Sequence, residues 1–249
     1  AIAGEKAGII KRRVPCIVGP QDHAGLDVIE RQAARLGAPL LAYGQHWHAS
    51  PERDGMIYQD DNGLLDLPRP VLLGDHQIQN AGMALAALRH LGFDEVACTA
   101  ALTNASWPAR MQRLQSGPLP DMARASGAEL WLDGGHNPAA GHALAAVLRR
   151  LPDRPTYLIC GMLNTKDVRG YLAPLAGVAE GLVALSIPGE ANTLSASNTA
   201  SAARDVGLAA QEAVDPQSAL KAILTQTPHA RVLICGSLYL AGAVLRENA

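Results

Sequence analysis

From about residue 116 onward, short apolar runs alternate with segments whose apolar residues recur at helical spacing. The apolar runs predict strands at 129–133, 156–160, 182–187 and 231–235. The segments between and after them predict helices at 139–151, 168–176, 200–206 and 216–225, and a last helix after residue 235. Strands that are apolar throughout and are separated by helices are typical of a parallel sheet covered on both faces. The alternation therefore predicts an α/β fold with a mostly parallel sheet.

The first 115 residues show a less regular α/β pattern. We expect an opening helix, then strands at 14–18 and 39–43 on either side of a helix at 26–36. A hairpin is expected between 55–58 and 64–67, because Asn62-Gly63 supplies residues that tolerate positive φ in a tight turn. Two helices, at 77–91 and 93–105, lead up to Trp107-Pro108 and are expected to bridge two domains. The predicted domains are residues 1–115 and 116–249.

Polar or glycine-rich turns follow three of the predicted strands. They are Asp133-Gly134-Gly135-His136-Asn137-Pro138, Gly161-Met162 and Gly236-Ser237. Ligands of parallel α/β sheets bind outside the carboxyl ends of the strands. We expect these three turns to share one edge of the sheet and to form a binding site there.

Composition limits the classes of function. The chain has 249 residues, 48% of them apolar, with 21 basic against 23 acidic residues, so it carries no basic footprint for nucleic acid or an anionic membrane. No apolar stretch approaches the roughly 20 residues of a membrane span, and the start does not read as a signal peptide. The four cysteines lack the spacing of a zinc site. We expect a cytoplasmic protein.

Six segments, in this order, resemble the folylpolyglutamate synthase and dihydrofolate synthase family of the Mur ligase superfamily. They are Ile2-Ala3-Gly4-Glu5-Lys6-Ala7-Gly8-Ile9-Ile10, Gly74-Asp75-His76-Gln77-Ile78-Gln79-Asn80-Ala81, Trp107-Pro108-Ala109-Arg110, Leu132-Asp133-Gly134-Gly135-His136-Asn137-Pro138, Gly161-Met162-Leu163-Asn164-Thr165-Lys166-Asp167 and Gly236-Ser237-Leu238-Tyr239-Leu240. The resemblance implies that residues 1–115 are the end of a central ATPase domain. Residues 116–249 would be a Rossmann-like C-terminal glutamate-ligase domain.

The same resemblance implies a reaction in folate biosynthesis and one-carbon metabolism. A folate or dihydropteroate carboxyl is phosphorylated by ATP, and the amino group of L-glutamate then displaces phosphate from the acyl phosphate. ATP and Mg²⁺ are the implied cofactors, and a monomer is expected. The choice between dihydropteroate and a reduced folate as acceptor is left open by this sequence.

Four residues are implied in catalysis and in binding ATP and metal. Lys6 would be carbamylated and would bind Mg²⁺ through its carbamate; otherwise it is a solvated helix lysine. Asn80 would contact ATP through its amide, although an asparagine near a helix start is often a cap. Arg110 would bind phosphate oxygens, with a surface salt bridge as the alternative. Asp133 would contact ATP at the ribose or through magnesium-bound water, while Asn137 is the better candidate to cap the following helix.

Three further residues complete the implied site. His136 would orient phosphate or the incoming glutamate, although an isolated histidine is often only hydrogen-bonded in place. Lys166 and Ser237 would hold the carboxylates of glutamate. Gly135 stands where the family usually has alanine, a departure expected to loosen the turn.

Phosphoryl transfer in this superfamily needs a P-loop, and none is found, because not one of the four lysines follows a glycine. In the family the P-loop, the pterin-contacting segments and the remaining magnesium ligands, a glutamate and a histidine, precede the segment that contains Lys6. We therefore expect this chain to be inactive alone. A non-catalytic nucleotide- or metabolite-binding α/β module is the alternative, although every strand-to-helix turn lacks GxGxxG. A serine hydrolase is disfavoured, since Ser237 lacks a GxSxG elbow.

Overall fold

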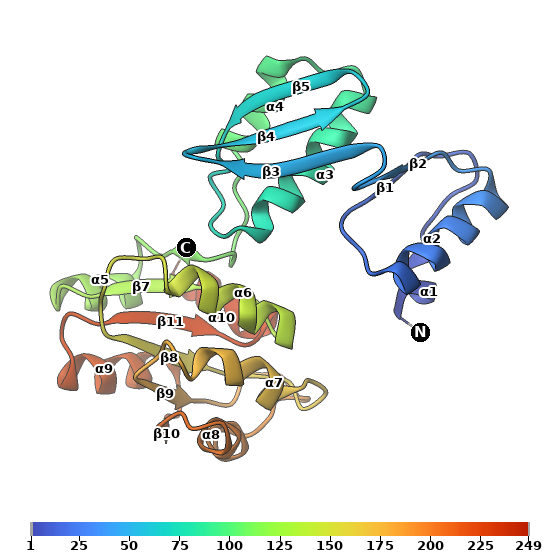
Figure 1. The fold of residues 1–249 in the computed structure, drawn as a ribbon. Coiled ribbons are helices and arrows are strands. Elements are labelled where there is room, and N and C mark those ends of the chain that lie inside the picture. Colours follow the sequence, from blue (N-terminus) through green and yellow to red (C-terminus); the bar gives the residue numbers. More distant parts are fainter. Residues whose placement is uncertain (1, 249) are drawn as a thin grey trace. The chain divides into compact units, whose positions relative to one another are not determined.

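A computed structural model describes residues 2–248, which fall into two compact units, divided between Ser106 and Trp107. The first unit begins with α1 (Ile2–Ala7), β1 (Cys16–Val18), α2 (His23–Leu36) and β2 (Leu40–Ala42) (Figure 1). β1 and β2 pair in parallel, and α2 provides the crossover connection that parallel strands need. The Asp22 carboxylate caps α2, and Gly37 ends it in the left-handed conformation, with φ of 59°.

The rest of the first unit is an antiparallel sheet covered by two helices. β3 (Trp47–Glu52), β4 (Gly55–Asp60) and β5 (Gly63–Pro68) form the sheet, followed by α3 (His76–His90) and α4 (Glu95–Thr103). Alternate strand residues such as Trp47, Met56 and Tyr58 join helix residues in one core. In the tight turn, Gly63 has a positive φ of 114° whereas Asn62 does not, so the expectation for Asn62 is wrong. Its backbone N–H instead binds the Asp60 carboxylate at 2.8 Å.

The second unit contains a six-stranded sheet in the order β10-β9-β8-β11-β7-β6. Its strands are β6 (Gln112–Arg113), β7 (Glu129–Leu132), β8 (Thr156–Cys160), β9 (Gly181–Ala184), β10 (Ala210–Glu212) and β11 (Arg231–Cys235). All neighbours pair in parallel except β6 with β7. The predicted α/β fold with a mostly parallel sheet is confirmed. The short strands β6 and β10 were not predicted.

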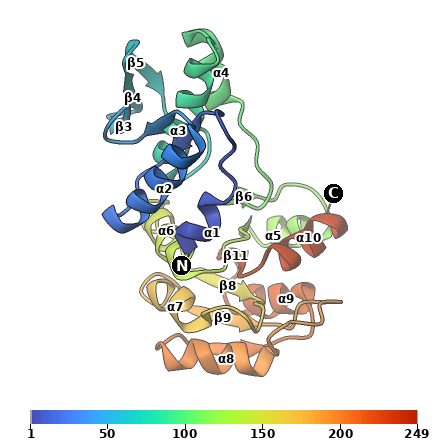
Figure 2. The ribbon, with the colours of Figure 1, turned by 90° about the vertical axis from the view of Figure 1, so that its right-hand side faces the viewer.

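Helices cover both faces of this sheet, and each face has its own core. One face is covered by α6 (Pro138–Leu148), α7 (Val168–Leu172), a short 3₁₀ helix (Ala173–Leu175) and α8 (Ala196–Asp205). The other carries α5 (Pro118–Ala125), α9 (Pro216–Gln226) and α10 (Leu238–Glu247) (Figure 2). Neighbouring strand residues point to opposite faces: Leu233 joins the first core and Ile234 the second.

The division between the units falls after Ser106, whereas the sequence predicted a domain boundary after residue 115. β6 lies between these two positions and pairs with β7, so residues 112–113 belong to the sheet of the second unit. Among the described residues, no helix is long and apolar enough to cross a membrane.

Candidate functional site

The turns after β7, β8 and β11 lie side by side at the carboxyl edge of the sheet. The backbone N–H of Asp133 donates to Ile234 at 3.0 Å, and that of Gly161 donates to Cys235 at 3.3 Å. Gly236 has φ of 100°, and a Cβ there would lie 2.8 Å from Cys160 Sγ and 2.9 Å from Gly161 O. Only glycine allows this close approach in a left-handed conformation. The prediction that the three turns share one edge is confirmed.

Asp133 lies at this edge, and its carboxylate binds backbone groups on both sides. Its side chain is buried, at 6% exposure. Oδ1 accepts from Gly135 N–H at 2.7 Å, and Oδ2 accepts from Met111 N–H at 2.8 Å. The bond to Met111 ties the turn after β7 to the loop that carries Arg110.

Arg110 is exposed at the tip of that loop. The loop is anchored by Gly134 N–H, which donates to Ala109 O at 2.8 Å. Among residues 2–248, no hydrogen bond or ion pair of the Arg110 guanidinium is found, so the surface-salt-bridge alternative does not hold for the described part of the chain. The guanidinium is therefore available to a ligand.

The residues after Asp133 form the start of α6. Asn137 caps the helix, its side chain accepting from Ala140 N–H at 2.9 Å, and Pro138 occupies the first turn, so the capping prediction is confirmed. The His136 ring is half-buried, with Nδ1 2.9 Å from Gly134 O, and this contact leaves Nε2 for a ligand. A Cβ at Gly135 would lie 2.8 Å from Asp133 Oδ1 and 2.8 Å from Ala140 Cβ, so glycine lets this turn close tightly rather than loosening it.

Lys166 and Ser237 follow the neighbouring strands β8 and β11. Ser237 is buried and caps α10, its hydroxyl oxygen accepting from Tyr239 N–H at 3.1 Å. The hydroxyl hydrogen is still able to donate to a ligand. Lys166 is half-buried, and its backbone N–H closes a turn to Leu163 O at 3.2 Å. That Lys166 and Ser237 hold the carboxylates of glutamate stays a prediction.

The other two predicted site residues belong to the first unit. Lys6 lies on α1 with its side chain 72% exposed and Nζ 3.6 Å from Glu5 Oε1. Asn80 lies inside α3 and does not cap it, because the cap position is Asp75. The Asn80 amide instead donates to Gln77 Oε1 at 3.0 Å. Within the described residues, no group of three or more His, Cys, Asp or Glu side chains could hold a metal ion.

Two buried cysteines end the strands β8 and β11, next to the carboxyl edge of the sheet. Cys160 and Cys235 are in register on β8 and β11 and are 0% and 1% exposed. Hydrogen bonding with Cys235, together with burial, raises the pKa of the Cys160 thiol well above its ordinary value. A protonated, buried thiol is a packing group and not a nucleophile.

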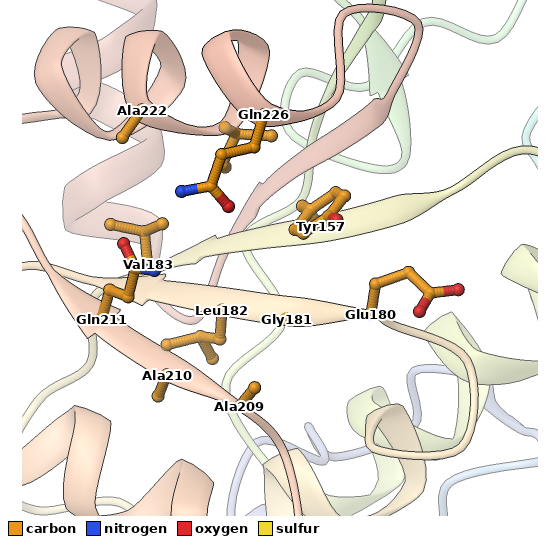
Figure 3. A pocket seen from close by; sticks show the side chains of 11 residues that line it. Tyr157, Glu180, Gly181, Leu182, Val183, Ala209, Ala210, Gln211, Ala222 and Gln226 are labelled. Atoms are coloured by element: carbon orange, nitrogen blue, oxygen red, sulfur yellow. The ribbon is translucent and has the colours of Figure 1, made fainter.

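A separate cavity of about 300 Å³ lies at the other end of the sheet (Figure 3). It is lined by residues at the starts of β8, β9 and β10 and by the last turns of α9, among them Tyr157, Gly181, Ala210 and Gln226. Because these residues begin the strands, the cavity is away from the carboxyl edge and does not form part of the candidate site.

Residues 109–238 match the family model described as "Mur ligase, glutamate ligase domain". The chain belongs to the Mur ligase family. The match falls within the second unit and covers every part of the carboxyl edge described above up to the start of α10.

The relatives of this Mur ligase chain are folylpolyglutamate and dihydrofolate synthases. It is 28% identical to the folylpolyglutamate synthase of Lacticaseibacillus casei over 98% of this chain and 56% of that protein. It is 32% identical to the dihydrofolate synthase/folylpolyglutamate synthase of Mycobacterium tuberculosis, over 73% of this chain and 39% of the relative. The chain spans about half the length of the curated relatives it matches.

Solved structures agree with these relatives. The structure resembles that of E. coli FolC in complex with DHPP and ADP, with a TM-score of 0.82 and 27% identity over 98% of this chain and 55% of that one. It also resembles M. tuberculosis folylpolyglutamate synthase complexed with ADP, with a TM-score of 0.83 and 25% identity, covering 98% and 58% of the two chains. The recognition made from the six ordered segments is confirmed.

One residue near the Mur ligase site was missed by sequence reasoning. Gln112 accepts a hydrogen bond from Ala109 N–H through Oε1 at 2.9 Å and so closes the loop around Arg110. Its position two residues after Arg110 was visible in the sequence. The local pattern, however, does not indicate that a glutamine at this position would hold the loop.

Proposed function

We propose that this chain supplies the glutamate-ligase part, and a portion of the nucleotide site, of an ATP-dependent ligase that joins L-glutamate to a folate or dihydropteroate carboxyl. The observation that carries the proposal is the match of residues 109–238 to the glutamate ligase domain, together with the shared edge formed by the turns after β7, β8 and β11. Solved relatives include an enzyme with Mn, AMPPNP and L-glutamate bound, which supports these ligand classes.

In this reaction the acceptor carboxylate takes the terminal phosphoryl group of ATP and becomes an acyl phosphate, releasing ADP. The amino nitrogen of glutamate then attacks the acyl carbon, the C–O bond to phosphate breaks, and an amide forms. In both steps negative charge develops on oxygens of the reacting phosphoryl and acyl groups. Positioned cations and hydrogen-bond donors of the protein stabilise this charge in the transition state.

The geometry favours nucleotide phosphate as the ligand of Arg110, because its exposed guanidinium has no partner among the described residues and suits bidentate binding of phosphate oxygens. Asp133 would contact the nucleotide at the ribose or through magnesium-bound water. Asn80 would bind ATP with its amide oxygen, since its amide nitrogen donates to Gln77. His136 would donate from Nε2 to phosphate or glutamate, which makes it a candidate catalytic residue together with carbamylated Lys6.

Lys166 and Ser237 would hold the glutamate carboxylates. They follow neighbouring strands, and each offers a hydrogen-bond donor that the fold does not fully use. A cationic amine and a hydroxyl are complementary to carboxylate oxygens.

The described residues contain no group of three or more His, Cys, Asp or Glu side chains that could hold a metal ion. A carbamylated Lys6 would be one ligand, and the exposed amine on α1 is open to carbon dioxide. The lack of a P-loop lysine likewise means that the triphosphate would not be fully held by this chain. We therefore propose that the chain is inactive alone, and that the complete enzyme is a cytoplasmic monomer acting on small molecules, without nucleic acid or membrane partners.

The test is to map ligands by NMR on the isotope-labelled chain and to assay ligation in parallel. ADP should shift the amide signals of 109–111 and 133–137, and L-glutamate those near Lys166 and Ser237. Arg110→Ala should weaken ADP binding about tenfold, the size of one lost charge-assisted contact. Arg149→Ala, at the exposed end of α6, is the matched control and should leave it unchanged.

The chain alone, given ATP, Mg²⁺, glutamate and a folate, should form no product. Ligation by the chain alone would contradict the proposed inactivity while supporting the reaction. ADP binding with no response to glutamate would favour a nucleotide-binding module, and shifts confined to another surface would contradict the proposed site.

A further inference from the structure

The backbone on both sides of Arg110 is in a conformation that residues with a Cβ rarely adopt. Ala109 has φ of 55° and Met111 has φ of 42°. Only two other non-glycine residues of the described chain, Arg13 and Arg53, share this property. Left-handed backbone is unfavourable for such residues and persists only where the surroundings hold it. Because two such residues flank Arg110, the loop must be held in place by contacts with its surroundings.

Three hydrogen bonds hold the loop. Gln112 Oε1 accepts from Ala109 N–H at 2.9 Å, Ala109 O accepts from Gly134 N–H at 2.8 Å, and Asp133 Oδ2 accepts from Met111 N–H at 2.8 Å. Ala109 and Met111 are also buried, at 8% and 5% exposure. The residue between them is thereby fixed at its backbone from both sides, while its side chain points to solvent.

The neighbouring arginines are used differently. Arg113 and Arg231 both pair with Glu129, at 3.7 and 3.1 Å, the first with a 52% exposed side chain and the second buried, so each charge has a partner in the fold. The backbone around Arg110 is held by these three hydrogen bonds, and its guanidinium has no hydrogen-bond or ion-pair partner among residues 2–248. A preorganised cation of this kind binds an anion with less loss of conformational entropy than one on a mobile loop.

We infer that Gln112 is a positioning residue for Arg110, and that Asp133 acts with it by binding Met111 N–H from the other side. The two side chains form a clamp that aims the guanidinium at phosphate oxygens. The inference rests on the proposed nucleotide function for the identity of the anion. It assigns Asp133 a role in holding the loop, in addition to any contact with the nucleotide.

The clamp is tested first without ligand, by amide hydrogen exchange resolved by NMR. Gln112→Ala should speed exchange at Ala109 N–H about tenfold or more, because its acceptor is removed and the left-handed turn can relax. Gly135 N–H, which binds Asp133 Oδ1, should be unchanged and reports that the sheet edge remains folded. Gln112→Glu keeps an acceptor oxygen at the same distance and should restore slow exchange at Ala109.

The positioning role is tested by a double-mutant cycle on ADP affinity. Gln112→Ala should weaken ADP binding about fivefold, the effect of losing one neutral hydrogen bond. In an Arg110→Ala background the same substitution should have no further effect, because Gln112 acts only through Arg110. A general structural role would weaken binding equally in both backgrounds.

Unchanged exchange at Ala109 in Gln112→Ala would show that the clamp does not exist in solution. Faster exchange with unaltered ADP affinity, or equal losses in both backgrounds, would overturn the positioning role. If the unmodified chain binds no ADP, the proposal that nucleotide phosphate is the anion bound by Arg110 is wrong. The exchange data still decide whether Gln112 holds the loop.

Discussion

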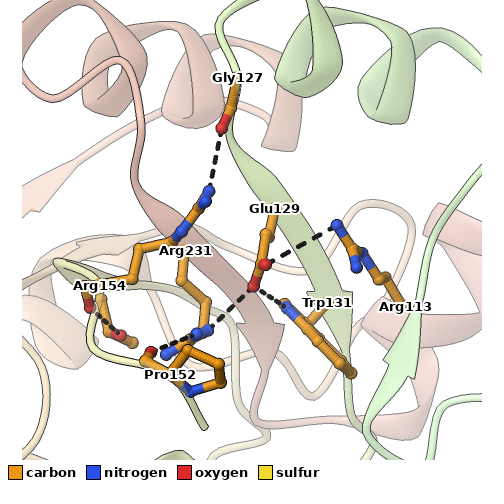
Figure 4. Close-up of polar contacts among 8 residues, drawn as sticks. Arg113, Gly127, Glu129, Trp131, Pro152, Arg154 and Arg231 are labelled. Carbon is orange, nitrogen blue, oxygen red and sulfur yellow. Dashed lines mark hydrogen bonds and ion pairs between the residues drawn. The ribbon is translucent and has the colours of Figure 1, made fainter.

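Arg231 carries a charge at the start of β11, although its side chain is only 3% exposed. Its Nε lies 3.1 Å from Glu129 Oε2, and its Nη2 donates to Pro152 O at 2.8 Å (Figure 4). Glu129 Oε2 also accepts from Trp131 Nε1 at 3.1 Å, and Arg113 lies over the Trp131 ring, 5.9 Å from its centroid. This network joins β6, β7 and β11 at the edge opposite to the candidate site.

Replacing Arg231 with methionine should therefore lower the free energy of unfolding by about 3 kcal/mol, because it leaves the half-buried Glu129 carboxylate without its main partner. Urea denaturation followed by circular dichroism measures the change. The double variant Arg231→Met with Glu129→Gln should recover part of the loss, since no uncompensated charge remains. Equal stability of the single variant and the unmodified chain would show that the pair is not formed in solution.

Because of the Glu129 carboxyl, we expect the free energy of unfolding to depend on pH. Burial acts to raise the pKa of Glu129, but hydrogen bonds from Trp131 and Arg231 and the nearby positive charges outweigh it, so the pKa lies below its ordinary 4.5. A carboxyl with a lowered pKa stabilises the fold above its unfolded pKa and loses that contribution as the pH falls through the folded value. Below pH 4.5, the unmodified chain should lose unfolding free energy more steeply than Glu129→Gln. Parallel curves for the two proteins would contradict this.

Single residues also show where sequence reasoning reaches its limit. The position of Asp133 at the end of a strand followed by glycines was predictable, because it depends on local pattern. Its bond to Met111 was not, because the partner is 22 positions away and is a backbone group that any residue provides. Asn80 was misread as a potential cap for a related reason: α3 begins at His76, five residues before the start that a cap at Asn80 would require.

Among the elements, α6 and α7 approach closely because α6 carries a glycine at their contact. A Cβ at Gly141 would lie 2.2 Å from Tyr171 O and 3.1 Å from Pro174 Cγ. The first of these atoms is backbone, so α7 itself would have to move. Since α6 follows the Asp133 turn and α7 follows the Lys166 turn, their packing sets the spacing between two parts of the candidate site.

Gly141→Ala should accordingly destabilise the chain by about 2 kcal/mol, a cost typical of overpacking, and it should disturb both turns. Gly242→Ala is a matched control on α10, where the nearest atom to a new Cβ is Arg246 Nη1 at 3.8 Å. That variant should gain about 0.5–1 kcal/mol from the higher helix propensity of alanine. Thermal unfolding of both variants measures the effects, and a stabilising Gly141→Ala would disprove the close contact.

The elements themselves were predictable in proportion to their length and apolar content. β7, β8, β9 and β11 are buried strands with continuous apolar runs, and each was predicted within a few residues. β3, β6 and β10 were missed: β6 and β10 have two and three residues, and β3 contains the polar and proline residues of Trp47–Glu52. Such strands are specified by the neighbour they pair with, which a local pattern does not contain.

At the scale of the whole molecule, each of the two units has its own hydrophobic core among the described residues. The core on one face of the six-stranded sheet and the core on the other use residues from 109 to 245 only, and the core around β3–β5 uses residues from 17 to 102. A set of elements that contains its own core has what it needs to fold independently.

We therefore expect residues 107–249, produced alone, to unfold in one cooperative thermal transition and to retain slow amide exchange at Met111 and Gly135, whose acceptor Asp133 lies in the same unit. Calorimetry of the full chain should show that transition at nearly the same temperature, because the second unit contains its own cores. A fragment with secondary structure but no cooperative transition would instead mean that the first unit is needed to order the glutamate-ligase fold. In that case the clamp around Arg110 would depend on both units.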